Sequence, residues 1–140
     1  MMYYTNNKPT QIPYELIDRV ITHGVNFLGI KDVAVEISFR RLGGVAANVD
    51  YFDEENTIDM QVDSEIWRYK DEFERTIFHE LVHAKQIMDG RLNIEYPSKW
   101  YGVEYNCAYL DLPWEKEAYA LEEEMMKSFK KVVDICVESV

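Results

Sequence analysis

Apolar residues return at nearly helical spacing in the first segment of the chain. After Pro13 they are placed to share one face of a helix. They are Leu16, Val20, Phe27 and Leu28. Gly29 follows directly, and glycine often ends a helix because it adopts the left-handed conformation needed there. The pattern predicts a helix over residues 13–28.

Strict alternation of apolar and polar residues predicts two strands further on. They are "VAVEISF" (33–39) and "TIDMQV" (57–62), and each should bury one side. The inward side chains would be Val33, Val35, Ile37 and Phe39 in the first strand, and Ile58, Met60 and Val62 in the second. Gly43 and Gly44 predict a tight hairpin turn leading into a strand over about 45–52. The polar "DEEN" predicts another turn, so we expect a three-stranded meander.

A long helical pattern begins at Asp71, a plausible helix cap with Glu74 three residues later. Its apolar stripe consists of Phe73, Ile77, Leu81, Ala84 and Met88. Gly90 is expected to end this helix. Residues 91–112 look irregular and are rich in tyrosine and tryptophan.

A last helix is predicted from Pro113 to about Glu138. Its inward stripe would consist of Trp114, Ala118, Leu121, Met125, Phe129, Val132 and Cys136. The chain shows no internal repeat and no domain linker, and the elements predict an α+β fold.

The composition fits one domain, residues 1–140. A chain of 140 residues with 47% hydrophobic content can bury one sizeable core and is too short for two. Its net charge of −11 disfavours nucleic acid and anionic membranes as partners, because both would repel it. The sequence contains no signal-peptide pattern and no span-length apolar run, so we expect a cytoplasmic protein. Cys107 and Cys136 have no CxxC spacing and are expected to be reduced core thiols.

The segment "TIFHELVHAKQ" contains the residues that point to chemistry. On a helix, His79 and His83 lie one turn apart on the same face and can aim at one metal ion. Glu80 would lie beside the metal, where it can take a proton from a water molecule bound there. This pattern predicts a hydrolytic metal site with Glu80 as general base.

The motif "HELVHAKQ", with a strand before it and an acidic helix after it, resembles the zincin metallopeptidases. It is most similar to the small gluzincin-like proteins, in which a glutamate from a later helix is the third zinc ligand. The resemblance covers about residues 30–125. It implies a small twisted, mainly antiparallel sheet packed on the HExxH helix, a Zn²⁺ ion, and hydrolysis of a peptide or protein substrate.

The third ligand has more than one candidate. No histidine follows His83, which excludes the all-histidine zincin patterns. Asp89 has the spacing of some metzincin-like ligands, but those proteins have a glycine where this chain has Gln86, so the helix should continue and turn Asp89 away. The resemblance directs attention instead to "LPWEKEAYALE", which fits the family pattern ExxA in two registers.

Those registers begin at Glu115 and Glu117, and neither ends in the aspartate that is usual in the family. Helical periodicity places Glu115 somewhat nearer the inward stripe, so it is the first choice and Glu117 the alternative. Glu122, two turns after Glu115, could be a buried acid that supports a ligand histidine.

Other features of the chain have ordinary explanations as well as functional ones. Most of the aromatic residues over 100–114 should cover the core, although one tyrosine could donate to an oxyanion. The strand 57–62 could hold an extended peptide or be an ordinary sheet strand. His23 is expected to be solvated. Two rival functions remain, namely a zinc-holding binding or regulatory protein with little peptidase activity, and a metal-free interaction protein.

Overall fold

The computed structural model describes the backbone of residues 2–138 and the side chains of residues 2–133. The larger elements in chain order are β1 (Met2–Asn6), α1 (Tyr14–Leu28), β2 (Ala34–Arg40), β3 (Ala47–Phe52), β4 (Thr57–Asp63), α2 (Glu72–Met88) and α3 (Pro113–Glu138). The short ones are η1 (Ile66–Arg68), β5 (Leu92–Asn93), β6 (Lys99–Trp100), β7 (Val103–Glu104) and η2 (Tyr109–Asp111). The α+β class and the three helices are confirmed. Within the described backbone, no helix combines the length and apolar character that crossing a lipid bilayer requires.

The main sheet has the strand order β1-β2-β4-β3. The strand β2 pairs in parallel with both β1 and β4, and only β3 and β4 pair antiparallel. The predicted meander is therefore wrong, and this sheet is mixed rather than mainly antiparallel. Gly43 and Gly44 do form a turn with positive φ, but the chain passes on to the sheet edge and β4 occupies the place beside β2.

Burial explains why β4 rather than β3 lies beside β2. Both β2 and β4 alternate strictly between buried and partly exposed residues, as central strands covered on one face do. In β3 no residue is fully buried, which suits an edge strand. Alternation shows which face of a strand is buried, and it does not show which strand lies next to it.

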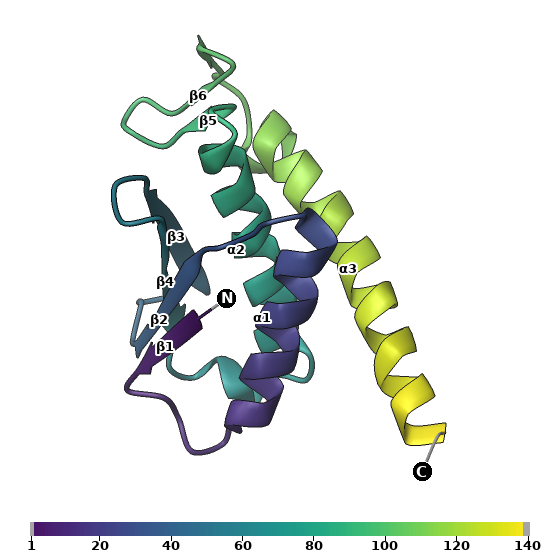
Figure 1. The fold of residues 1–140 in the computed structure, drawn as a ribbon. Coiled ribbons are helices and arrows are strands. Elements are labelled where there is room, and N and C mark those ends of the chain that lie inside the picture. Colours follow the sequence, from purple (N-terminus) through teal and green to yellow (C-terminus); the bar gives the residue numbers. More distant parts are fainter. Residues whose placement is uncertain (1, 139–140) are drawn as a thin grey trace.

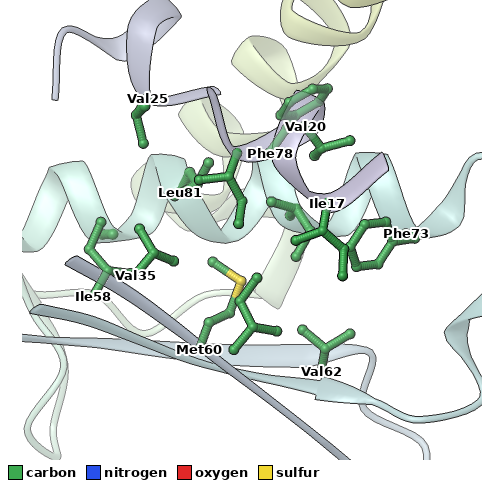
Figure 2. Close-up of a cluster of buried hydrophobic side chains, with 14 of the residues drawn as sticks. Ile17, Val20, Val25, Val35, Ile58, Met60, Val62, Phe73, Phe78 and Leu81 are labelled. Carbon is green, nitrogen blue, oxygen red and sulfur yellow. The ribbon is translucent and has the colours of Figure 1, made fainter. Parts of the chain in front are cut away.

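All three helices lie on the same side of this sheet, with α3 farthest from it (Figure 1). The predicted inward residues of β2 and β4 meet the apolar stripe of α2 and the buried face of α1 (Figure 2). Val35, Ile58, Met60 and Val62 point from the sheet toward Phe73, Phe78 and Leu81 of α2 and Ile17 and Val20 of α1. This packing fixes α2 against the sheet, and its opposite flank faces α3.

The helix α2 begins after Asp71 and ends one residue before Asp89, close to the prediction. Asp71 occupies the cap position with a positive φ of 63°, and its side chain makes no capping hydrogen bond. It accepts instead from Lys130 of α3 at 3.1 Å. Gly90 follows with a φ of 75°, and the N–H of Arg91 donates to the Gln86 carbonyl at 3.0 Å. The helix therefore ends in a left-handed turn, as predicted.

The inward stripe of α3 is partly as predicted. Trp114, Ala118, Met125 and Phe129 are buried and Leu121 packs against the core, but Val132 is exposed, and Met126, which was not predicted, is buried. Cys107 is a free thiol, as predicted, but its side chain is exposed, so its predicted place in the core is wrong. Cys136 lies outside the side chains that the structure describes.

The segment between α2 and α3 is less irregular than predicted. The strands β5, β6 and β7 form a small antiparallel sheet, and η2 leads into α3. In Figure 1 this segment lies beyond the C-terminal end of α2, beside the start of α3. Many of its large apolar side chains are exposed, including Ile94, Tyr96, Tyr101 and Leu110.

Candidate metal centre

His79, His83 and Glu115 meet between α2 and the first turn of α3. The Nε2 atoms of the two histidines are 3.1 Å apart, and Glu115 Oε1 lies 3.0 Å from His79 Nε2 and 3.1 Å from His83 Nε2. All three residues are buried. Among the described residues, they form the group of potential metal ligands whose donor atoms lie within 4.8 Å of one another.

Helical periodicity in both α2 and α3 brings the two histidines and Glu115 together. His79 and His83 are four residues apart on the face of α2 that turns away from its apolar stripe. Along α3, Glu115, Ala118 and Glu122 recur at helical spacing, and Ala118 is fully buried. Because alanine has a small side chain, it allows α3 to approach α2 closely, and the carboxylates on either side of it can reach the histidines.

His79 is supported on its outer side by Glu122. His79 Nδ1 lies 3.0 Å from Glu122 Oε1, and Arg75 Nη1 lies 3.6 Å from Glu122 Oε2 and 2.9 Å from Glu123 Oε2. An ionised carboxylate only accepts hydrogen bonds, so His79 Nδ1 carries the proton. Glu122 therefore has the supporting position that the sequence suggested.

His83 is supported by Gln86, a residue that sequence reasoning did not place at the site. His83 Nδ1 lies 2.8 Å from Gln86 Oε1. Gln86 Nε2 donates to the Trp114 carbonyl at 3.0 Å and to Glu117 Oε1 at 3.2 Å. Since both of those partners are acceptors, the amide must direct its oxygen toward His83, and His83 Nδ1 carries the proton.

Glu117, the alternative ligand, is held away from the histidines by Arg91. Arg91 Nη1 donates to the two carboxylate oxygens of Glu117 at 2.9 and 2.8 Å. Asp89 is also elsewhere, in ion pairs with Lys85 at 3.1 Å and Arg91 at 3.6 Å. The structure thus brings Glu115 to the histidines and places Glu117 and Asp89 in ion pairs.

The tautomers of the histidines determine what the site can hold. With both Nδ1 atoms protonated, a neutral His79 and a neutral His83 each direct an Nε2 lone pair toward Glu115 Oε1. Three acceptors at 3.0 to 3.1 Å repel one another unless a cation lies among them. A proton can join two of these atoms, whereas a metal ion can accept electron pairs from all three.

The donor set and its spacing could hold a metal ion, and zinc is one ion that uses such ligands. Two imidazole nitrogens and one carboxylate oxygen are a common ligand set for catalytic zinc, with a fourth position left open. A tetrahedral zinc with bonds of about 2.0–2.2 Å holds its ligand atoms roughly 3.3–3.6 Å apart. The three atoms of this site would need to separate only slightly to accept it.

Without a metal, the same contacts shift the pKa values of the ligands. Burial by itself lowers the pKa of His79, but the hydrogen bonds to Glu115 and Glu122 outweigh it and raise the pKa to about 9. Burial raises the pKa of Glu115, yet the hydrogen bonds to His79 and His83 outweigh it and lower the pKa to about 2. Without a metal ion, a shared proton therefore offsets part of the repulsion among these atoms.

Glu80 is buried beside the histidines with its carboxylate free of hydrogen bonds to other described side chains. Burial raises its pKa, an effect that the neighbouring His83 and His79 oppose. A carboxylate with a raised pKa is a stronger base than an exposed one. Its position one residue after a ligand histidine is the one that the sequence predicted for a general base.

Two tyrosines stand at the site. The ring of Tyr119 lies 4.5 Å from that of His79, centroid to centroid. Burial, together with the neighbouring Tyr119 and Glu115, raises the pKa of Tyr109, so its hydroxyl stays protonated. The sequence did not show which tyrosine would lie here, because the loop that places Tyr109 has no periodic pattern.

Two cavities meet at Glu80, and β3 lines both. One, of about 590 Å³, lies along the N-terminal half of α2 and includes His79 and Glu122. The other, of about 390 Å³, lies toward the C-terminal end of α2 and includes His83 and Glu115. Tyr109 and Val45 border both cavities. The candidate ligands are therefore buried and still reachable from open space on two sides.

His23 is partly buried, whereas the sequence predicted a solvated residue. Its ring lies among Phe129, Phe78 and Phe27, with centroid distances of 5.4, 5.8 and 6.4 Å. It takes no part in the candidate metal centre.

Comparisons of the chain with protein-family models, with curated protein sequences and with solved structures found no significant match.

Proposed function

We propose that this chain is a zinc-dependent peptidase with a zincin-like fold. His79, His83 and Glu115 would hold the metal, and Glu80 would be the general base. The observation that supports this most directly is the meeting of two histidine nitrogens and one carboxylate oxygen among buried side chains, at spacings that suit zinc. The packing of the main sheet on α2 is a second support, since the resemblance to zincins implies a sheet packed on the HExxH helix.

Each residue of the site would have a separate role in peptide hydrolysis. A bound zinc ion would act as a Lewis acid that makes water more acidic and polarises the scissile carbonyl. Glu80 accepts a proton from the attacking water as the oxygen forms its bond to the carbonyl carbon. Glu80 then delivers this proton to the leaving nitrogen as the C–N bond breaks. Tyr109, with its protonated hydroxyl at the border of both cavities, donates a hydrogen bond to the developing oxyanion.

The metal assignment is tested by zinc content after purification without added metal. We expect about one zinc per wild-type chain and per Glu117→Ala chain, and a loss of zinc in Glu115→Ala. Glu124→Ala is a matched control, because Glu124 is an exposed glutamate on the same helix. Zinc retained by Glu115→Ala but lost from Glu117→Ala would show that the wrong glutamate was assigned.

The activity is tested with a synthetic peptide library and zinc-loaded protein. Wild type should cleave peptides, and Glu80→Gln should bind zinc normally while its kcat falls about 10²- to 10⁴-fold. If zinc binds in stoichiometric amount and no peptide is cleaved under any condition, a zinc-holding binding protein replaces the peptidase. If no zinc binds, both of these functions are wrong.

A further inference from the structure

The two cavities that meet at Glu80 differ in chemistry. The cavity of about 390 Å³, here called the apolar cavity, is bordered mainly by Val49, Ile87, Leu92, Ile94 and Trp114 besides the site residues. Leu92 and Trp114 are buried and form its deeper wall, whereas Ile94 is 41% exposed and stands at its rim. A bulky apolar side chain placed there would lose its contact with water, which favours binding.

The cavity of about 590 Å³, here called the acidic cavity, contains the carboxylates of Glu72 and Glu122. Apart from the candidate ligand His79, its basic side chain is Arg75, whose charge is already paired with Glu123 at 2.9 Å and Glu122 at 3.6 Å. Glu72 also borders the next cavity along α2 and makes no ion pair within the described residues. An acidic side chain of a ligand would meet the unpaired negative charge of Glu72 here.

Glu80 borders both cavities, as do Val45, which lies just before β3, and Ala47, the first residue of β3. A bond that reacts beside Glu80 would therefore have one flank in the apolar cavity and the other in the acidic cavity. The helix α2 runs along both cavities. It contributes Glu72 and Arg75 to the acidic cavity and Ile87 to the apolar cavity.

We infer that the site selects peptides with a bulky apolar side chain on one side of the scissile bond and excludes acidic side chains on the other. This inference rests on the proposed peptidase function. The apolar cavity supplies the preference, and Glu72 supplies the exclusion. A change in either cavity should alter one side of the cleavage pattern and leave the other side as it was.

The test is mass-spectrometric sequencing of the products that zinc-loaded protein makes from a random synthetic peptide library. Wild type should favour Leu, Ile or Phe over Ala by about 10-fold at one position flanking the cut. On the opposite side, Asp and Glu should be depleted. Cleavage without an apolar preference on one side would overturn the inference and leave the peptidase proposal intact.

Two variants assign each preference to its cavity. Ile94→Asp should weaken the apolar preference, whereas Val103→Asp, the same kind of change at a residue that is 53% exposed and borders neither cavity, should not. Glu72→Lys should raise cleavage of peptides with Asp or Glu on the opposite side by roughly 3- to 10-fold. Glu124→Lys is the control with the same change of charge. Equal effects in variant and control would contradict the assignment.

A binding measurement keeps the inference testable if no peptide is cleaved. Fluorescein-labelled peptides with a central Leu-Lys or Asp-Asp pair are titrated with zinc-loaded Glu80→Gln, and anisotropy gives the affinity. Tighter binding of the Leu-Lys peptide, weakened by Ile94→Asp, would support the two cavities as binding sites while the peptidase proposal fails. Equal binding of both peptides would overturn the inference as well.

Discussion

Gln86 shows how much one buried side chain contributes to the candidate metal centre. It is fully buried, and it accepts from His83 while donating to α3. Its amide orientation depends on Glu117, and Arg91 in turn holds Glu117. Through this chain of contacts, a residue after the end of α2 helps to keep the His83 Nε2 lone pair directed at the site.

We predict that Gln86→Leu weakens zinc binding about 10- to 100-fold, because residues that orient a metal ligand typically contribute that much. Leucine fills a similar volume but cannot accept a hydrogen bond from His83 Nδ1. Competition with a chromophoric zinc chelator measures the affinity, and nitrogen NMR of the metal-free protein reports the His83 tautomer. Gln61→Leu makes the same chemical change on β4, outside the site residues, and should leave both readouts unchanged. Unchanged zinc affinity in Gln86→Leu would refute the role of Gln86.

His23 gives the fold a dependence on pH that is separate from the metal site. Burial lowers its pKa below the ordinary value of 6.5, and its Nε2 atom is buried without a hydrogen-bond partner. The unfolded chain therefore takes up a proton at a higher pH than the folded chain does. The stability from a neutral His23 is present above pH 6.5 and is lost as the pH falls through 6.5 toward the lowered pKa.

We predict that His23→Leu reduces the loss of stability between pH 7.5 and pH 5.5. Leucine can occupy the space among the three phenylalanines without gaining a charge. Urea unfolding of both proteins at the two pH values measures the effect, and the difference between them isolates His23 from the other titrating groups. Parallel losses in the two proteins would mean that His23 does not contribute.

At the scale of elements, the crossing of α1 and α2 depends on Gly24. A β-carbon at this position would lie 2.5 Å from Leu81 Cδ1 and 3.3 Å from Phe78 Cδ1. Both side chains are fully buried in the packing between α1, α2 and the sheet. The absence of a side chain at Gly24 thus allows α1 to pack closely on the helix that carries His79 and His83.

We predict that Gly24→Val lowers the free energy of unfolding by about 1–3 kcal/mol, the usual cost of overpacking a core. Thr22→Val places the same residue on the exposed side of α1 and should change stability by less than about 0.5 kcal/mol. Chemical denaturation of the two variants compares them. Similar free energies of unfolding in the two variants would show that α1 can move away from α2 to accept a valine at position 24 without loss of stability.

Elements formed by local pattern could be predicted from the sequence, and pairings between them could not. The bounds of α1, α2 and α3 followed from apolar periodicity with Gly29 and Gly90 as end signals. The strand β1 was missed because Met2–Asn6 is short and has no fully buried residue. Its parallel pairing with β2, and the placement of β4 beside β2, depend on contacts between distant segments that no local pattern encodes.

At the scale of the whole molecule, the same distinction applies to the candidate site. The resemblance to the zincins directed attention to Glu115 and Glu117, and the inward stripe of α3 then placed Glu115 first. The supporting roles of Gln86 and Glu117 were not predictable, because they require the antiparallel contact of α2 and α3 that pairs Gln86 with Trp114 and Arg91 with Glu117. Tertiary contact, rather than sequence spacing, decides which polar residue supports which histidine.

The three candidate ligands lie on only two helices, His79 and His83 on α2 and Glu115 on α3. A metal ion held by His83 and Glu115 would tie α2 to α3 and close a loop of residues 84–114, which contains β5, β6, β7 and η2. Closing a loop removes conformational freedom from the unfolded chain, as a disulfide bond does. The ion would therefore act as a reversible cross-link around a segment with little buried surface, and the wall of the apolar cavity would be ordered by the same atom that the site binds.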